Sequence, residues 1–301
     1  MEIAGQRSNA QLVKRGFFVV LVVAFILFTA LLTPVPFLIL GWFVQLGPGE
    51  TSHRVHEIAF GALFVLPLVG LVGQLRRPET KIAPMYQVVI PLLFTIFVVA
   101  VLAGEPDPSM ALFLVFPLLI VLLHPARARL LRPKFSFSPL LLALALAAAI
   151  PLLFFAVDQL RVSAEAGRIA PRVFDSLPED ATDAEVERAL QKAASGEALE
   201  AIEHYGHWSA MGAFAISIVV SALIAASRMP GWHLTAWSTV AVVAVYGVAS
   251  LVFPKDASAK GGLWGVLAIL WAAAFVVVSV RESTQAPEAA AAAVTSTSPA
   301  H

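Results

Sequence analysis

Long apolar runs recur along nearly the whole chain, and they constrain the fold more than any other feature of the sequence. Each run approaches the roughly 20 residues that an α-helix needs to cross the hydrocarbon core of a bilayer. Of the 301 residues, 59% are hydrophobic and 13% are charged, whereas a soluble domain has about 45–50% apolar and about 25% charged residues. The composition excludes a soluble globular domain and a disordered chain. It predicts an all-α, polytopic transmembrane bundle.

Eight runs are predicted to span the membrane. They cover residues 16–46, 57–75, 83–103, 109–124, 137–158, 207–227, 232–253 and 262–280. The first run is too long for one straight span, and Pro34 and Pro36 predict a kink within it. A signal peptide is the alternative for this N-terminus. However, the run far exceeds a usual h-region of about 7–15 residues, and no small-residue cleavage site follows it.

Basic residues lie on every second connection between the predicted spans. They are Arg7, Lys14, Arg15, Arg76, Arg77, Lys81, Arg127, Arg129, Arg132, Lys134, Arg228 and Arg281. The acidic residues Glu50, Glu105 and Asp107 and the acid-rich segment 158–206 lie on the other connections. Because basic loops stay in the cytoplasm, we expect a multi-pass protein of the inner (plasma) membrane. Both termini are predicted to be cytoplasmic, and segment 158–206 is predicted to lie outside.

The segments outside the spans differ in character. Within 158–206, residues 181–204 predict an amphipathic helix that Asp180 or Thr182 caps and Gly196 breaks. We expect it to cover the outer face, with a partner-docking surface as the alternative. The chain then divides into a cytoplasmic N-terminus (1–15), a first four-helix half (16–134), a second half (135–282) and a disordered cytoplasmic tail (283–301).

The two predicted halves share a sequence pattern. The second and sixth spans begin with His56-Glu57-Ile58-Ala59-Phe60-Gly61-Ala62-Leu63 and His207-Trp208-Ser209-Ala210-Met211-Gly212-Ala213-Phe214, which have the frame H-x-x-A-x-G-A in common. Both spans end in arginine followed by proline. This pattern predicts an internal duplication, with the halves related by an axis along the membrane normal. Chance similarity between helices rich in Ala and Gly is the alternative.

Ionisable side chains gather at the predicted outer ends of the same two spans. The candidate site residues are His53, His56, Glu57, Glu203, His204 and His207. Imidazole and carboxylate together suit a divalent metal such as Zn, Fe or Cu. Alternatively, His56 and His207 ligate a haem, or the cluster titrates with outside pH. Ordinary interfacial residues at helix ends are the structural alternative, and we interpret His124 and His233 in that way.

The sequence lacks the signatures of several other functional classes of protein. The spans carry no acidic or basic residue away from their ends, which argues against an ion-coupled transporter. The chain has no cysteine, so thiolate chemistry is excluded. No nucleotide-binding or hydrolase motif occurs. Whether the protein is an enzyme stays open.

The layout of eight spans, two halves, cytoplasmic termini and histidines at the outer ends of the second and sixth spans resembles the haem A synthase family. Residues 246–254 and the helix after them are similar in general residue character to that family's seventh and eighth helices. The resemblance implies haem binding in each half and oxidation of a haem methyl group. Of the family's ligands, it assigns His56 and His207.

The sequence therefore predicts an integral membrane protein with a His/Glu site, outside the cytoplasm, that binds a metal or haem. Its expected partners are the lipid bilayer and another membrane protein, and no nucleic acid. The alternative is a non-catalytic subunit of a membrane complex, or a sensor, whose outer loop docks a partner.

Overall fold

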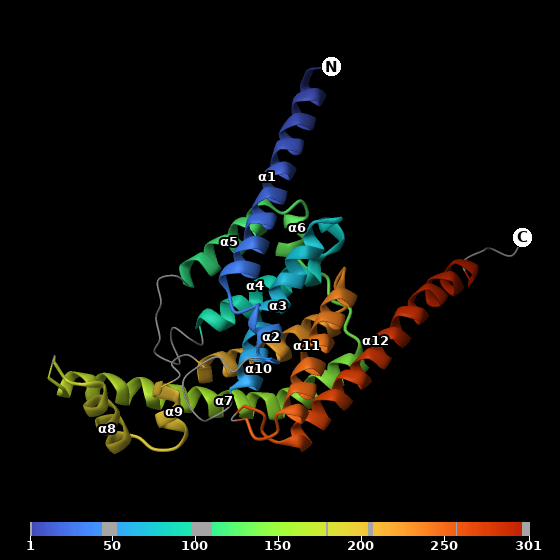
Figure 1. The fold of residues 1–301 in the computed structure, drawn as a ribbon. Coiled ribbons are helices and arrows are strands. Elements are labelled where there is room, and N and C mark those ends of the chain that lie inside the picture. The colour runs from blue at the N-terminus through green and yellow to red at the C-terminus, as the bar shows by residue number, and fades with distance from the viewer. Residues whose placement is uncertain are drawn as a thin grey trace, which may run out of the picture.

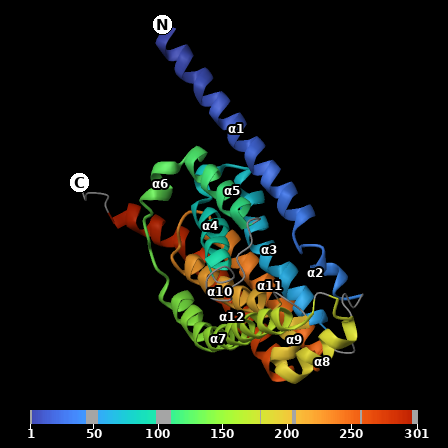
Figure 2. The same cartoon turned by 90° about the vertical axis from the view of Figure 1, so that its left-hand side faces the viewer.

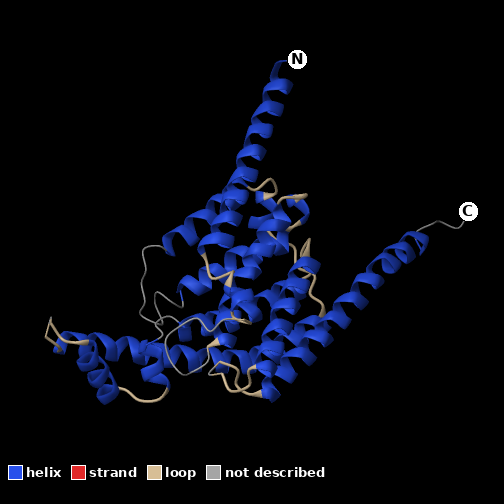
Figure 3. Cartoon of the chain, viewed as in Figure 1, coloured by secondary structure: helices blue, strands red, loops and turns tan. Residues whose placement is uncertain are grey.

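The computed structural model describes residues 2–43, 53–97, 110–178, 180–203, 207–256 and 258–296. Every regular element in these ranges is helical, and none is a strand (Figure 3). The elements are α1 (Glu2–Leu32), α2 (Phe37–Leu40), α3 (Arg54–Gln74), η1 (Pro78–Thr80), α4 (Ile82–Phe97), α5 (Met110–Leu123), α6 (Arg127–Leu131), α7 (Pro139–Ser176), α8 (Asp183–Ala193), α9 (Glu197–Glu203), α10 (His207–Ala226), α11 (Trp232–Val252) and α12 (Gly262–Ser296).

Six helical segments in the described residues are long and apolar enough to cross a membrane. They are Gln11–Leu40, Arg54–Gln74, Pro139–Ser176, His207–Ala226, Trp232–Val252 and Gly262–Thr284. The third and fourth predicted spans correspond to α4 and α5, whose apolar parts are shorter, and residues 98–109 between them lie outside the described residues. The predicted all-helical architecture is therefore confirmed, and six apolar segments, rather than the predicted eight, are compatible with a multi-pass membrane protein.

The helices form an inner layer and an outer layer (Figures 1 and 2). In the apolar stretches of α3 and α10, 72% and 83% of residues are buried, against 28% in those of α1 and α7 and 22% in that of α12. The outer helices present large apolar side chains such as Phe154 and Leu263 to the surroundings. Such a surface is stable in lipid rather than in water. The core centres on α3 and α10, which pack on each other.

Helix packing is organised around this inner pair. In one part of the bundle α3 packs on α1 and α4, and α5 packs on α1 and α4. In the other part α10 packs on α7 and α11, and α12 packs on α7 and α11. Between the two parts, α3 contacts α11 and α4 contacts α10. The contact pattern stays the same when α1, α3, α4 and α5 are exchanged for α7, α10, α11 and α12, in that order.

Several helix ends differ from the prediction. As predicted, the first span bends at its prolines, since α1 ends at Leu32 and α2 begins at Phe37. However, α7 continues through Gly167 and Pro171 to Ser176, and α8 and α9 follow at its far end (Figure 1). As predicted, Gly196 (φ +59°) breaks the helical segment 181–204, which forms α8 and α9. The helix α12 extends to Ser296, into the alanine-rich part of the predicted tail, where alanine favours helix.

Candidate functional site

The candidate site lies where the two inner helices begin. His53 directly precedes α3, His56 and Glu57 occupy its first turn, and His207 is the first residue of α10. Because α3 and α10 pack on each other, imidazole groups from two distant stretches of the chain meet at one end of the bundle. His53, His56 and Glu57 are buried, each less than 5% exposed, and His207 is half-buried.

The imidazole rings of His56 and His207 stack face to face. Their centroids are 4.0 Å apart and their planes differ by 14°. The ring of His53 stands edge-on to that of His207, with 5.9 Å between centroids and 70° between planes. Three imidazoles therefore form one contact group, with the carboxylate of Glu57 next to His56 in the chain.

Glycines of the shared motif hold the two inner helices close to the helices that precede them. A Cβ on Gly61 would lie 2.4 Å from the backbone N of Leu38 in α2, and a Cβ on Gly212 would lie 2.9 Å from Cγ of Leu160 in α7. A side chain at either position would push the neighbouring helix away. The frame H-x-x-A-x-G-A thus has a packing function one turn beyond each histidine.

A carboxylate that the sequence analysis did not select caps the first of these helices. Asp256, from the connection between α11 and α12, accepts a hydrogen bond from the backbone N–H of Val55 at 3.0 Å. This contact satisfies one of the first free N–H groups of α3. The only signal in the sequence is an isolated aspartate between two spans, which does not reveal the helix that it caps.

Two of the predicted site residues are not placed by the structure. Glu203 is the last residue of α9, and its side chain lies outside the described residues. His204 also lies outside them. The described part of the site consists of His53, His56, Glu57 and His207.

The ring geometry distinguishes the two predicted ligands. Axial haem ligation places an iron between two imidazole nitrogens that face each other, whereas the stacked rings of His56 and His207 present their faces. The arrangement does not fit a haem held between these two histidines. A separate cavity of about 260 Å³ among α7, α10, α11 and α12 is lined by Tyr246, Trp264 and apolar residues, and no histidine lines it.

A metal ion requires a smaller rearrangement. Among the described residues, no three His, Asp or Glu side chains are arranged to hold an ion in common. Two imidazoles on one tetrahedral ion have ring centroids roughly 5 Å apart, given Zn–N bonds of about 2.0–2.1 Å. The observed centroid distances of 4.0 and 5.9 Å lie on either side of that value.

A second polar group lies near the opposite end of α3. His124, which follows α5, is only 1% exposed. Its Nε2 lies 3.0 Å from Oε1 of Gln74, and its Nδ1 accepts the backbone N–H of Ala126 at 3.0 Å. Burial lowers the pKa of His124 to about 4, while the Glu79 carboxylate opposes the shift. The prediction of an interfacial residue was wrong, because its partner Gln74 is buried beside it.

No protein-family model, curated protein or solved structure matches this chain. The fold and the site define a class: a bundle of long apolar helices, compatible with a multi-pass membrane protein, whose two inner helices bring histidines together at one end.

Proposed function

We propose that this chain is an eight-span inner-membrane protein made of two similar four-helix halves, and that it binds a divalent transition-metal ion between His56 and His207. The observation that carries the proposal is the contact of these two imidazoles, which are 151 residues apart and occupy the same position of the repeated motif. A site on the axis between two halves is built from equivalent residues of both.

Further pairs with the same spacing support the duplication. Gln87 in α4 and Ser238 in α11 are 151 residues apart and share a hydrogen bond of 2.9 Å. Arg77 and Arg228, also 151 residues apart, have left-handed φ values of 52° and 51°. Non-glycine residues rarely adopt this conformation, so its occurrence at equivalent turns favours a common origin over chance similarity of small residues.

The distribution of charge supports the proposed orientation. The predicted cytoplasmic residues Arg76, Arg77 and Lys81 follow the C-terminal end of α3, opposite the end that carries His56. Under the positive-inside rule, the histidine end then faces away from the cytoplasm, together with α8 and α9. We count α4 and α5 as the third and fourth spans in this arrangement.

The absence of cysteine allows a direct test of this topology. Single substitutions of exposed residues, Arg129→Cys in α6 and Asp183→Cys in α8, introduce one thiol each. In intact bacterial cells, a membrane-impermeant maleimide is expected to label D183C, and to label R129C only after the membrane is opened. Labelling of R129C from outside would reverse the proposed orientation.

The donor set supports an ion of the Zn, Cu or Fe group. Neutral imidazole is a common ligand of these metals, and carboxylate adds negative charge. His56 and His207 would hold the ion, and His53 and Glu57 lie close to His56 in the chain. A bound ion supplies Lewis acidity, which polarises an oxygen ligand. The haem implied by the resembling family is not part of the proposal, since stacked rings do not fit it.

Metal binding is tested on protein purified in detergent with an affinity tag that contains no histidine. Titration with Co²⁺, followed by its visible absorption, and elemental analysis after loading with Zn²⁺ are expected to give one ion per chain. The His56→Ala/His207→Ala variant is expected to lose it. A matched control, His233→Ala, removes a histidine from the first turn of α11 at the other end of the bundle and should retain the ion. Equal binding by the double variant would refute the proposal.

A second candidate function is docking of a membrane partner by the segment beyond the bundle. It is favoured by Phe174, which is 50% exposed on the final turns of α7, and by α8, whose N-terminus Thr182 and Glu185 cap. In this alternative, Phe174→Ser reduces co-purification of a specific second chain without changing metal content. Co-purification that is unaffected by F174S argues against docking at this surface.

A further inference from the structure

The two inner helices end in equivalent turns that differ in charge. Arg77 follows α3 and Arg228 follows α10, and both have the left-handed backbone described above. The turns lie side by side, since a Cβ on Gly231 would lie 2.9 Å from the carbonyl O of Thr80. Equivalent arginines thus occupy similar positions at the end of the bundle opposite the histidines.

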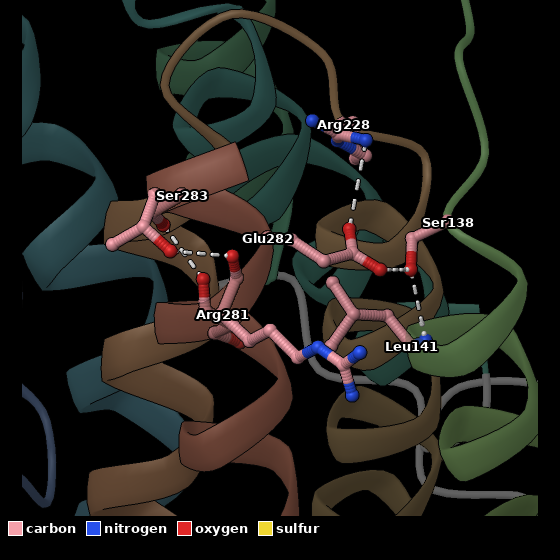
Figure 4. A network of polar contacts seen from close by, with 8 residues as sticks. Ser138, Leu141, Arg228, Arg281, Glu282 and Ser283 are labelled. Carbon is pink, nitrogen blue, oxygen red and sulfur yellow. Dashed lines mark hydrogen bonds and ion pairs between the residues drawn. The ribbon is translucent and has the colours of Figure 1, made fainter. Parts of the chain in front are cut away.

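In the second half, a carboxylate of the chain itself neutralises the arginine. Nη1 of Arg228 lies 3.6 Å from Oε2 of Glu282 in α12. Glu282 is buried and also accepts a hydrogen bond from the hydroxyl of Ser138, as Figure 4 shows. Ser138 in turn accepts the backbone N–H of Leu141 and caps α7. The anionic position at this turn is therefore occupied.

In the first half, Arg77 lines a cleft together with two further cations. Arg76, Arg77 and Lys81 line a cleft of about 590 Å³, and Arg76 and Arg77 are exposed. Within the described part of the chain, none of the three forms an ion pair within 4.0 Å. Glu79 is the one acidic residue of this turn, and it does not line the cleft. The cleft therefore has an excess of positive charge.

The rest of the cleft is apolar. Its wall consists of Leu68, Val69 and Val72 on α3 and Leu234 on α11. Gly73 keeps the two helices close, since a Cβ there would lie 2.6 Å from Cδ2 of Leu234. From Leu68 to Arg76 the wall extends about 12 Å along the helix, at a rise of about 1.5 Å per residue. A ligand that fits has an anionic head and an apolar tail.

We infer that this cleft binds an anionic phospholipid, with its phosphate beside Arg76, Arg77 and Lys81 and an acyl chain along Leu68, Val72 and Leu234. Arginine binds phosphate oxygens through paired N–H donors, and basic pockets between membrane helices bind anionic headgroups. A soluble phosphate would leave the apolar wall uncovered, whereas a lipid covers both parts. The inference does not depend on metal binding at the histidines.

Native mass spectrometry of the full chain, delipidated in detergent, tests the inference. We expect tighter binding of phosphatidylglycerol than of phosphatidylcholine with the same acyl chains. In the Arg76→Gln/Arg77→Gln/Lys81→Gln variant, affinity for phosphatidylglycerol should fall at least about tenfold, because each cation near a headgroup contributes appreciably. A control variant, Arg127→Gln/Arg132→Gln/Lys134→Gln, removes the same charge from exposed positions outside the cleft and should bind as the unmodified protein does.

Two results would overturn the inference. One is equal loss of phosphatidylglycerol in the cleft variant and the control variant, which would indicate a non-specific charge effect. The other is displacement of the lipid by millimolar glycerol phosphate, which would indicate recognition of a soluble anion without the tail. Val72→Trp, which fills the apolar part at a half-exposed position, should weaken phosphatidylglycerol binding while the three cations remain.

Discussion

The turns after α3 and α10 have the same backbone conformation, but within the described residues only one of their arginines is paired with a carboxylate. Arg228 is paired with the buried Glu282, whereas Arg77 borders an open, basic cleft. The difference indicates which features of the two halves are interchangeable. The left-handed backbone is found at two arginines 151 residues apart, and Gln87 and Ser238, also 151 residues apart, share a hydrogen bond. The side chains around the two turns, in contrast, differ. Under the proposed duplication, the bundle has kept one core and acquired two different surfaces.

The helix ends next to these turns differ in the same manner. In the first half, Gln74 and His124 form a buried polar pair. The residues 151 positions further along the chain are Ala225 and Phe275, both fully buried and apolar. One half therefore has a titratable group at this depth where the other has hydrocarbon. The predictions below use such pairs of positions.

The largest effect is expected from adding a methyl group to the motif glycines. In Gly61→Ala the new Cβ meets the backbone of Leu38 at 2.4 Å, so a helix must move, and we expect destabilisation of about 3 kcal/mol. In Gly212→Ala it meets the side chain of Leu160 at 2.9 Å, which can rotate, so about 1 kcal/mol is expected. Thermal unfolding in detergent measures both. Equal losses would mean that the two contacts have the same rigidity.

The next effect is a dependence of stability on pH to which His124, in the first half, contributes. The pKa of His124 is about 4 in the folded protein, below its ordinary value of 6.5. As pH falls through this interval the unfolded chain binds the proton first, so stability is lost between about pH 6.5 and 4. Between pH 7 and 5 the expected loss is about 2 kcal/mol.

A variant that copies the second half isolates this contribution. Gln74→Ala/His124→Phe introduces the residues found at 225 and 275 and removes the titrating group together with its partner. Its melting temperature should fall less between pH 7 and 5 than that of the unmodified protein. The same acid sensitivity in both proteins would assign the pH dependence to other groups.

The sequence predicts the repeated contacts better than the divergent ones. The frame H-x-x-A-x-G-A shows where two helices begin alike, and the structure then brings His56 and His207 into contact. Apolar runs likewise predict the helices, because membrane spans need an apolar length that is visible in the sequence. Whether the contacting histidines bind an ion stays a prediction.

Pairs that join distant segments without a repeated pattern could not be predicted. Glu282 follows the last predicted span directly, and nothing local indicates that it pairs with Arg228 and Ser138. The role of Asp256 at the start of α3 is hidden for the same reason. The length of α7 was missed because charge, which ends an apolar run, does not end a helix.

The third effect directly compares the two arginines. In Arg228→Gln the buried carboxylate of Glu282 loses its cation, and we expect a loss of about 1–2 kcal/mol, since the pair is only partly exposed. Arg77→Gln removes an exposed cation and should change stability by less than about 0.5 kcal/mol. Chemical denaturation in detergent measures both. A double-mutant cycle with Glu282→Gln then isolates the ion pair, and a coupling energy near zero would contradict the role assigned to it.

The smallest effect concerns the hydrogen bond that joins the halves. Gln87 and Ser238 are buried and 151 residues apart. Ser238→Ala leaves the Gln87 amide without this partner and should cost about 0.5–1 kcal/mol, as interhelical hydrogen bonds in membrane proteins do. If the two positions are equivalent, the exchanged variant Gln87→Ser/Ser238→Gln restores the same bond in reverse. Its melting temperature should then be closer to that of the unmodified protein than that of Gln87→Ser or Ser238→Gln alone. An exchanged variant less stable than both single variants would show that α4 and α11 surround these positions differently, and the halves would then not be related by an axis at this contact.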